Sequence, residues 1–348
     1  MPLLKSDYHY QLPDTLIAIH PADRRENSRM MVLNRSNRTL EHRSFYSFPE
    51  LLEPGSVLVI NDSRVIPARL PGKRLSGATI EALLIENVGG NQWRCKLKNA
   101  SKAKPGETLS FCNGRLAANL VKKEESGEYV IDFQKTSDIL KSLEQVGYAP
   151  LPPYIHKMRN DVNNREEDLN RYQTVYANNY GSIAAPTAGL HFTPELLDTI
   201  RDKGVEIASI TLHVGLGTFE PIREDDVSKH TMHEERFEIS KKTAATILKA
   251  KAEKRAIIAV GTTTTRSLES AWQQGTLKTG EQSTGLFIYP PYQYKVVDNL
   301  LTNFHLPEST LLMLVSAMAG KDFLFKAYNE AVASQYRFFS FGDCMYIK

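Results

Sequence analysis

The sequence has few cysteines, and their spacing does not pair them. Its 348 residues include three, Cys95, Cys112 and Cys344, and none forms a Cys-x-x-Cys motif. This spacing argues against a cysteine-based zinc knuckle and a disulfide framework, and it favours a reducing compartment. The sequence also lacks an apolar run of about 18 residues and a charged-then-apolar signal segment at its start. We therefore expect a cytoplasmic protein without a membrane segment.

A strong excess of one charge is also missing. The 43 Lys and Arg residues against 40 Asp and Glu residues give a formal net charge of +3, far below that of a dedicated nucleic-acid coat protein. Composition alone therefore does not decide whether the protein binds RNA, although a local basic patch could still hold phosphate. A hydrophobic content of 41% is enough for a buried core, and the length allows two domains.

The texture of the sequence changes after about residue 65. Short alternating apolar and polar runs, separated by Gly, Asn and Pro, fill residues 70–135 and are typical of an all-β domain such as a small barrel. On both sides, buried-strand runs such as 205–214 alternate with helical patterns. We therefore predict an α/β main domain, residues 1–65 plus 150–348, with an inserted small all-β, barrel-like domain at residues 66–149.

Four of the histidines lie in a Gly-rich stretch at residues 181–235. Glycine permits the tight turns and the close backbone approach that a binding loop requires. The run Thr-Pro-Glu at 193–195 predicts a helix start, which places His191 just ahead of a helix N-terminus. His213 stands near the end of a predicted buried strand, where α/β folds commonly carry site residues. Imidazoles there suit acid–base chemistry near neutral pH. A purely structural, hydrogen-bonded role is the alternative.

Another signal follows the strand-like run 255–260. Gly261, four threonines and Arg266 lead from it into a helical pattern. A strand, a Gly/Thr turn and a helix form an anion-binding arrangement, because free backbone N–H groups and the helix dipole meet there. The match is weak by itself, since the Lys of a P-loop and the G-x-G-x-x-G of a dinucleotide fold are absent. Arg266 fits a carboxylate or phosphate ligand, with a structural ion pair as the alternative.

Two rival functions are open at this point. A metal-dependent hydrolase would use His230, His233 and Glu234 with His191 or His213 as a further ligand, but the order of these residues does not match the H-E-x-x-H motif. A non-catalytic RNA-binding protein would use a basic face of the predicted barrel, although a solvated lysine-rich face is the default interpretation. The basic residues in this region are Lys73, Arg74, Lys96, Lys98, Lys102 and Lys104, with Trp93 among them.

Six long motifs follow one another along the chain in the order of one known family. They are NDSRVIPARL (61–70), AAPTAGLHFT (184–193), LHVGLGTF (212–219), HTMHEE (230–235), GTTTTRSLES (261–270) and KVVDNLLTNFHLPEST (295–310). Together with YQTVYA at 172–177, they resemble the S-adenosylmethionine:tRNA ribosyltransferase-isomerases of queuosine biosynthesis. The resemblance covers essentially the whole chain, and six ordered motifs are far more specific than a single glycine motif.

The resemblance implies a reaction, a fold and partners. The family moves the ribosyl part of S-adenosylmethionine to 7-aminomethyl-7-deazaguanine at the tRNA wobble position, which gives epoxyqueuosine tRNA and releases adenine and methionine. S-Adenosylmethionine is consumed as a substrate, so no cofactor and no metal are expected. The implied partner is the tRNA anticodon stem-loop. We expect a monomer without a membrane or protein partner, and the family's α/β domain with an inserted β-barrel agrees with the texture change.

The implied reaction requires a base beside the sulfonium, an acid that helps adenine leave, and groups that position a cationic substrate. Histidines and carboxylates in the matched motifs suit these tasks. We expect one acid of the pair Glu234 and Glu235, or Asp298, to meet the sulfonium charge. The candidate catalytic residues are His191, His213, His233, Glu234 and His305.

Further residues of the matched motifs are expected to bind the substrates. Arg64 and Arg69 would hold RNA phosphate or join the two domains, and the glycines would let backbone approach the ligand. The candidate substrate-binding residues are Thr187, Gly189, Gly215, Gly217, Thr262, Arg266, Asp298, Asn303, Arg64 and Arg69.

Overall fold

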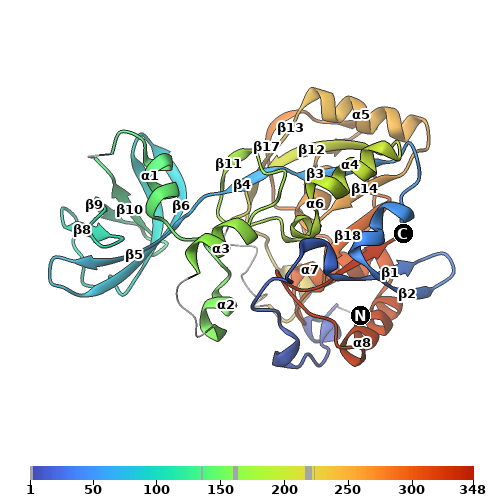
Figure 1. The fold of residues 1–348 in the computed structure, drawn as a ribbon, viewed down its shortest axis with the longest axis horizontal. Helices are drawn as coiled ribbons and strands as arrows, with labels where there is room; N and C mark the ends of the chain where they lie inside the picture. The colour runs from blue at the N-terminus through green and yellow to red at the C-terminus, as the bar shows by residue number, and fades with distance from the viewer. Residues whose placement is uncertain (1–2, 135, 160–163, 216–221, 223) are drawn as a thin grey trace. The chain divides into compact units, whose positions relative to one another are not determined.

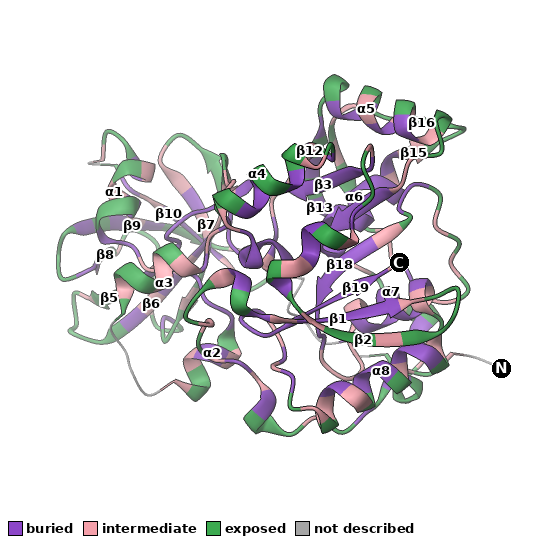
Figure 2. Ribbon diagram, turned by 45° about the vertical axis from the view of Figure 1, so that its right-hand side comes forward, coloured by how far each residue is buried: buried purple, intermediate pink, exposed green. Residues whose placement is uncertain are grey.

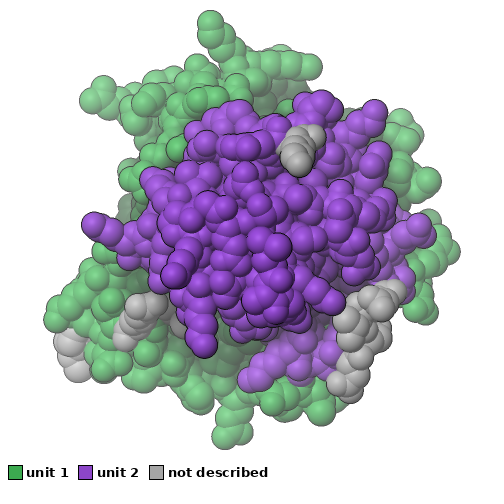
Figure 3. Space-filling view, turned by 90° about the vertical axis from the view of Figure 1, so that its left-hand side faces the viewer, with its two compact units in different colours: residues 1–63, 174–179, 186–348 green, residues 64–173, 180–185 purple. Residues whose placement is uncertain are grey.

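The structure is a computed structural model that describes residues 3–134, 136–159, 164–215, 222 and 224–348. The chain divides into two compact units, shown in separate colours in Figure 3. Unit 1 comprises Met1–Ser63, Thr174–Asn179 and Pro186–Lys348. Unit 2 comprises Arg64–Gln173 and Tyr180–Ala185. The short strands β4 (Ser63–Val65) and β11 (Asn179–Ser182) contain two of the points at which the chain passes from one unit to the other.

Unit 1 is built on a nine-stranded sheet in the order β17-β13-β12-β3-β14-β18-β19-β1-β2. The four central strands, β12 (Glu206–Leu212), β3 (Val57–Asn61), β14 (Ile257–Val260) and β18 (Asn299–Asn303), are all parallel to one another. β3 and β14 are buried along their whole length (Figure 2). Their runs of Val and Ile follow from this position, because a central parallel strand is covered on both faces.

The outer strands of this sheet mostly run antiparallel to the central ones. β13 (Glu235–Ile239) and β19 (Cys344–Ile347) flank the parallel set, β1 (Arg29–Asn34) is parallel to β19, and the margins are β17 (Gly280–Thr284) and β2 (Thr39–Ser44). The registers Leu212 with Phe237 and Asn303 with Cys344 show that β13 and β19 begin where the parallel strands end. We call this side of the sheet the carboxyl edge.

Helices and short 3-10 turns surround the sheet (Figure 1). α5 and α6 contact β12, β3 and β14, while α7 and α8 pack against each other. On one face of the sheet, η4, η5 and α4 share a core cluster with β3, β14 and β1. The helices of unit 1 are α4 (Pro194–Asp202), α5 (Lys241–Ala252), α6 (Thr262–Ala271), α7 (Thr310–Ala319) and α8 (Lys321–Ala333). The 3-10 turns are η1 (Lys5–Tyr8), η2 (Asp14–Leu16), η3 (Arg25–Asn27), η4 (Phe45–Leu51), η5 (Thr187–His191) and η7 (Val227–Lys229), and β15 (Trp272–Gln273) pairs with β16 (Thr276–Leu277).

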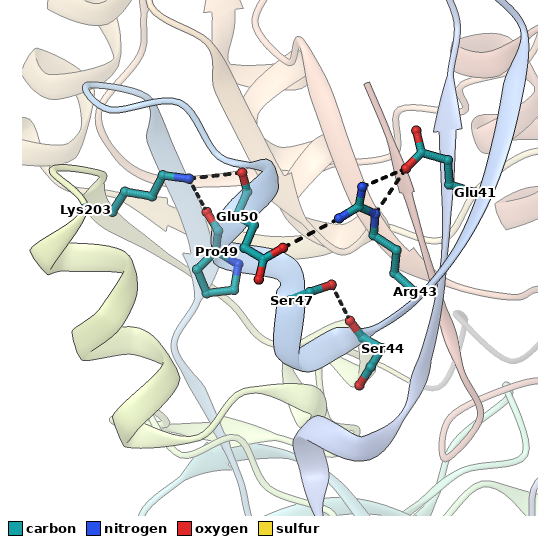
Figure 4. Close-up of polar contacts among 7 residues, drawn as sticks. All are labelled: Glu41, Arg43, Ser44, Ser47, Pro49, Glu50 and Lys203. Atoms are coloured by element: carbon teal, nitrogen blue, oxygen red, sulfur yellow. Dashed lines mark hydrogen bonds and ion pairs between the residues drawn. The ribbon is translucent and has the colours of Figure 1, made fainter.

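The predicted start of α4 is confirmed. Thr193 is the N-cap, its Oγ1 accepts from the Leu196 N–H at 3.2 Å, and Pro194 occupies the first helical position. Such a cap is worth about 1 kcal/mol because it satisfies an otherwise unpaired backbone donor. At the other end of α4, Lys203 Nζ donates to the carbonyls of Pro49 at 2.7 Å and Glu50 at 3.0 Å (Figure 4). These bonds hold η4 against α4.

Unit 2 contains a closed barrel in the order β10-β7-β6-β5-β8-β9. Closure leaves no unpaired strand edge, and alternate residues such as Ile80, Ala82 and Leu84 fill the interior. The predicted fold class, an α/β part and a small barrel-like part, is confirmed, while the bounds given for the inserted domain, residues 66–149, stay a prediction. The strands are β5 (Arg69–Arg74), β6 (Thr79–Gly89), β7 (Gln92–Lys98), β8 (Thr108–Phe111), β9 (Leu116–Lys123) and β10 (Tyr129–Asp132), and the helices are α1 (Ile139–Val146), α2 (Pro153–Met158) and α3 (Arg165–Arg171).

Candidate active site

The topology of unit 1 brings distant motifs to the carboxyl edge. Parallel strands end on the same side of a sheet, so the residues that follow β12, β14 and β18 lie there, and so do the residues that precede β13. η5, which carries His191, contacts β18. The candidate residues found at this edge or in η5 are Thr187, Gly189, His191, His213, Gly215, His233, Glu234, Thr262, Asn303 and His305. Gly217 lies outside the described residues.

His191 is buried, with 3% of its surface exposed, and both ring nitrogens have partners. Its Nδ1 lies 3.0 Å from Ser28 Oγ, and its Nε2 lies 3.3 Å from the amide nitrogen of Asn303. The Asn303 amide nitrogen also donates to the Phe339 carbonyl at 3.2 Å, which fixes its orientation. Nε2 of His191 therefore accepts, and Nδ1–H donates to Ser28. Burial, with smaller contributions from Arg337 and Arg25, lowers the pKa of His191 to about 3.

His305, two residues after Asn303, is also a buried histidine with hydrogen-bonded neighbours. Its Nε2 lies 3.0 Å from Thr302 Oγ1, its backbone N–H donates to the Tyr328 hydroxyl at 3.0 Å, and its carbonyl accepts from the Tyr10 hydroxyl at 2.5 Å. Burial lowers the pKa of His305 to about 3. Both imidazoles are therefore neutral at pH 7 and poorly suited to abstract a proton, because an effective base has a pKa near the working pH.

Gly189 allows an unusually close approach within η5. A Cβ at this position would lie 2.0 Å from Tyr176 Oη, so only glycine fits without a shift. The Tyr176 hydroxyl and Asn303 Oδ1 are both buried, and neither has a hydrogen-bond partner among the residues that the structure describes. Buried polar atoms without partners are uncommon and point to a ligand or to water. Tyr176 is not among the candidate residues predicted from the sequence, although it lies in the YQTVYA motif.

His213 differs from the two neutral, paired histidines. It is half-buried just after β12, and its Nδ1 is buried without a partner in the described part of the chain. Burial lowers the pKa of His213, and the nearby charge of Asp62 opposes this shift. Asp62 Oδ1 accepts from Thr211 Oγ1 at 2.7 Å. His213 therefore has an available ring nitrogen and a neighbouring carboxylate that favours its protonated form.

Glu234 and Glu235 point to opposite sides, as expected for neighbours at the start of a strand. Glu234 is exposed. Glu235 is buried and forms an ion pair with Arg266, with 2.5 Å between Oε2 and the Arg266 Nη1. Arg266 Nε also donates to the Leu286 carbonyl at 2.9 Å. The structure therefore assigns Arg266 a structural ion pair, the alternative given above, and leaves Glu234 as the acid of the pair that is open to a ligand.

Asp298 does not lie at the carboxyl edge, contrary to its expected role beside the sulfonium. It precedes β18, and its Oδ2 accepts from the Ile257 N–H at 2.8 Å at the start of β14. Both strands are parallel, so Asp298 lies at the opposite edge. The separation is about four residues of strand, on the order of 13 Å. The motif alone does not place Asp298 at one edge or the other, because the direction of β18 within the sheet decides this.

The N-terminus of α6 adjoins η5. Gly261, with φ of 90°, is the N-cap and provides no side-chain cap, and a Cβ there would lie 3.7 Å from the Ala188 Cβ. Thr264 Oγ1 and Thr265 Oγ1 donate back to the carbonyls of Val260 and Gly261 at 2.7 and 3.0 Å, so these hydroxyls do not cap the helix. The arrangement can accept an anion through the first backbone N–H groups, beginning at Thr262.

The candidate residues Arg64 and Arg69 both lie in unit 2. Arg64 lies over the Tyr180 ring, 4.7 Å from its centroid, and 3.8 Å from Glu144. Arg69 Nη2 lies 2.6 Å from Glu81. Trp93 is 4% exposed inside the barrel, so it does not provide a stacking surface for RNA. The lysines that accompany it in the sequence, Lys96, Lys98, Lys102 and Lys104, are at least partly exposed.

The candidate residues that the structure describes do not form a metal site. Within the described ranges, no group of three or more His, Cys, Asp or Glu side chains is arranged to hold a metal ion. His230 Nδ1 instead lies 3.2 Å from Glu224 Oε2. The geometry therefore gives no support to the rival metal-dependent hydrolase.

Comparison with known proteins decides the family. The model of the family described as "Queuosine biosynthesis protein" matches residues 5–347. The chain belongs to this family. It is 49% identical over 98% of its length to the S-adenosylmethionine:tRNA ribosyltransferase-isomerase of Desulforamulus reducens, and 50% identical over 98% of its length to that of Symbiobacterium thermophilum, each match covering 99% of the relative. The resemblance indicated by the motifs is confirmed.

A solved structure supports the same assignment. The crystal structure of the S-adenosylmethionine tRNA ribosyltransferase from Thermotoga maritima has a TM-score of 0.57 and 38% sequence identity, over 99% of this chain and 100% of that one. In the part of the chain that the structure describes, no helix is both long and apolar enough to cross a membrane.

Proposed function

We propose that this protein is an S-adenosylmethionine:tRNA ribosyltransferase-isomerase that acts on 7-aminomethyl-7-deazaguanine at the wobble position of the tRNA anticodon stem-loop. It transfers the ribosyl part of S-adenosylmethionine, forms epoxyqueuosine, and releases adenine and methionine. The observation that carries this proposal is the match at 49% and 50% identity over nearly the full length of two relatives with that name. We further propose a cytoplasmic monomer that consumes S-adenosylmethionine as a substrate and needs no resident cofactor.

The carboxyl edge of unit 1 is the proposed site of the chemistry. A base must remove a proton beside the sulfonium, and such a group needs a pKa near neutrality and an available lone pair. His213 is a better candidate than His191 and His305, because its Nδ1 lacks a partner among the described residues and the charge of Asp62 opposes the lowering of its pKa by burial. We assign acid–base work to His213, His233 and Glu234, and hydrogen-bonding roles to the two neutral rings.

The remaining groups of this edge would position S-adenosylmethionine. The first N–H groups of α6 suit the carboxylate of its methionyl part, because the helix dipole favours a negative charge there. The exposed carboxylate of Glu234 suits the sulfonium. Asn303 Oδ1 and the Tyr176 hydroxyl, which both lack partners among the described residues, suit hydroxyl or amine donors of the ribose and adenine.

Adenine release tests the proposal directly. Purified protein should release adenine from S-adenosylmethionine only when the tRNA carries the 7-aminomethyl-7-deazaguanine base. His213→Gln should lower kcat by about 100-fold or more if this ring is the base. His42→Gln, on the outer strand β2, is the matched control and should keep full activity. The absence of adenine release with the modified tRNA would refute the function, while full activity of His213→Gln would remove only the assigned role.

A further inference from the structure

Unit 2 contains a cavity that the proposed chemistry does not use. Its volume is about 100 Å³, about the share of liquid volume taken by three water molecules. It therefore has room for a compact group of a few heavy atoms. The residues that line it are Arg69, Tyr148, Ala149, Leu151, His156, Arg159, Arg165 and Asp168.

The charges around this cavity do not cancel. Arg69 pairs with Glu81 at 2.6 Å, and Arg159 pairs with Asp168 at 2.7 Å. Arg165 instead donates to two backbone carbonyls, at 2.8 Å from Nε to Gly147 O and at 2.6 Å from Nη2 to Glu144 O. Three guanidinium groups with two carboxylates leave a net charge of about one positive unit. Backbone carbonyls hold the third guanidinium in place without neutralising it.

His156 adds a hydrogen-bond donor beside these arginines. Arg69 Nη1 lies 3.1 Å from His156 Nδ1, and a guanidinium can only donate, so Nδ1 accepts and the proton of the neutral ring is on Nε2. That Nε2 is buried and has no partner among the residues described. Burial first, and then the charge of Arg69, lowers the pKa of His156 to about 4. The ring is therefore neutral at pH 7, and its Nε2–H donates to none of the residues that the structure describes.

An ion-pair network that only ties α2 and α3 to the barrel is the simpler explanation of these contacts. It accounts for the pairs Arg69 with Glu81 and Arg159 with Asp168. It does not account for the charge of Arg165, for the His156 donor that has no partner in the described part of the chain, or for the space between them. An anion would satisfy all three, because guanidinium groups bind phosphate oxygens through directed N–H bonds.

We propose that this cavity binds one backbone phosphate of the RNA substrate, with Arg165 and Arg69 as the main contacts and His156 as an additional donor. The inference rests on the proposed function, since it takes the anion from the tRNA on which the enzyme acts. An RNA backbone presents phosphates to any such pocket, and phosphate contacts position a nucleic acid without reading its sequence. A free phosphate ion has the same chemistry, so the experiment separates these two sources.

The test measures binding of a fluorescent anticodon stem-loop RNA to the full-length protein by anisotropy, across a range of salt concentrations. Arg165→Gln should raise the Kd about tenfold at low salt and reduce the slope of log K against log salt by about 0.7–0.9, the value of one phosphate contact. Ala149→Leu fills the cavity without a change of charge and should weaken binding in the same way. Arg94→Gln removes a half-buried arginine paired with Glu86 at 2.7 Å, outside the cavity, and is the matched control with unchanged binding.

Three outcomes would overturn the proposal. The first is wild-type affinity and slope for both cavity variants, each shown to be folded by circular dichroism. The second is an equally weakened binding in Arg94→Gln, which would indicate a general charge effect. The third combines two results. Inorganic phosphate, at constant ionic strength, stabilises wild type and not Arg165→Gln against heat, but the cavity variants bind RNA as wild type does. The cavity would then bind a free phosphate ion and not the RNA backbone. Adenine release by the wild type is measured separately, so its failure would refute the enzyme assignment and leave the binding result interpretable.

Discussion

Replacement of Gly189 by alanine would test the close approach at the centre of the candidate site. A Cβ atom there would lie 2.0 Å from Tyr176 Oη and 2.9 Å from both Tyr176 Cζ and Thr174 Cγ2. Separations this short do not occur between real side chains, so either Tyr176 or the backbone of η5 has to move. The ring of Tyr176 is restrained, since it packs edge-on against Phe192 with 6.2 Å between centroids and lies against the main core cluster.

The loss of stability caused by Gly189→Ala can be estimated from the packing around it. Insertion of a methyl group into a well-packed region costs about 1–3 kcal/mol, because neighbours leave their preferred rotamers. We therefore expect Gly189→Ala to lower the free energy of unfolding by about 1–3 kcal/mol. Adenine release should fall as well, because a displaced η5 carries His191 and its bond to Asn303 out of position.

Urea unfolding followed by circular dichroism would measure this destabilisation as a shift of the midpoint at constant m value. Tyr176→Phe is the matched partner, since it deletes the oxygen that would lie 2.0 Å from the new Cβ and keeps the atoms that would lie at 2.9 Å. In the Tyr176→Phe variant, Gly189→Ala should lower the free energy of unfolding by less than it does in wild type. The effects of the two substitutions on stability should therefore be non-additive. An alanine variant with wild-type stability and wild-type adenine release would refute the argument from packing.

Three other sets of substitutions test the ionisable groups. The folded-state pKa of His191 is about 3, against an ordinary value of 6.5, so the unfolded chain binds this proton more readily. The neutral ring therefore stabilises the folded state fully above about pH 6.5, and this stabilisation decreases toward pH 3 by about 1.4 kcal/mol per pH unit. The free energy of unfolding of His191→Gln should accordingly fall less steeply than that of wild type between pH 7 and 5. Equal slopes of the free energy of unfolding against pH in the two proteins would contradict this prediction. Arg266→Gln removes the guanidinium that pairs with the buried Glu235 carboxylate and should lower the free energy of unfolding by about 3–5 kcal/mol, whereas replacement of both residues by glutamine should recover part of that stability in the same urea titration. If the pair of replacements costs as much as Arg266→Gln alone, the ion pair is not the cause. Replacement of four lysines of unit 2 by glutamine should raise the KM for tRNA. The slope of its logarithm against log salt should fall by about 0.7–0.9 for each phosphate that the variant no longer binds. An unchanged slope would exclude these lysines as an RNA-binding surface. These lysines are Lys96, Lys98, Lys102 and Lys104.

Local signals in the sequence predicted local structure well. Thr193 and Pro194 mark the start of α4 because a cap and a fixed φ act within one turn. The short runs of alternating apolar and polar residues after residue 65 predicted the barrel, because such alternation arises when one face of a strand is buried. The order of motifs predicted the family, and the comparisons confirm it.

The roles of single side chains were harder to predict, because they depend on partners that are remote in sequence. Arg266 was predicted with two alternatives, and its partner Glu235 lies on β13, 31 residues away in the sequence. Trp93 was grouped with lysines that are its neighbours in sequence, but strand alternation buries its ring. Asp298 was selected from a matched motif, and the parallel direction of β18 places it at the opposite edge.

The amino-acid sequence by itself determined the class of fold, the start of α4 and the family, since each depends on patterns within a few residues or on motifs in a fixed order. Only the tertiary structure decided which histidines are neutral and which ring nitrogen is available, because burial and hydrogen-bond partners set those properties. His191 and His213 are alike as residues in Gly-rich runs. They differ because one is enclosed between Ser28 and Asn303, whereas the other has a buried nitrogen without a partner among the described residues.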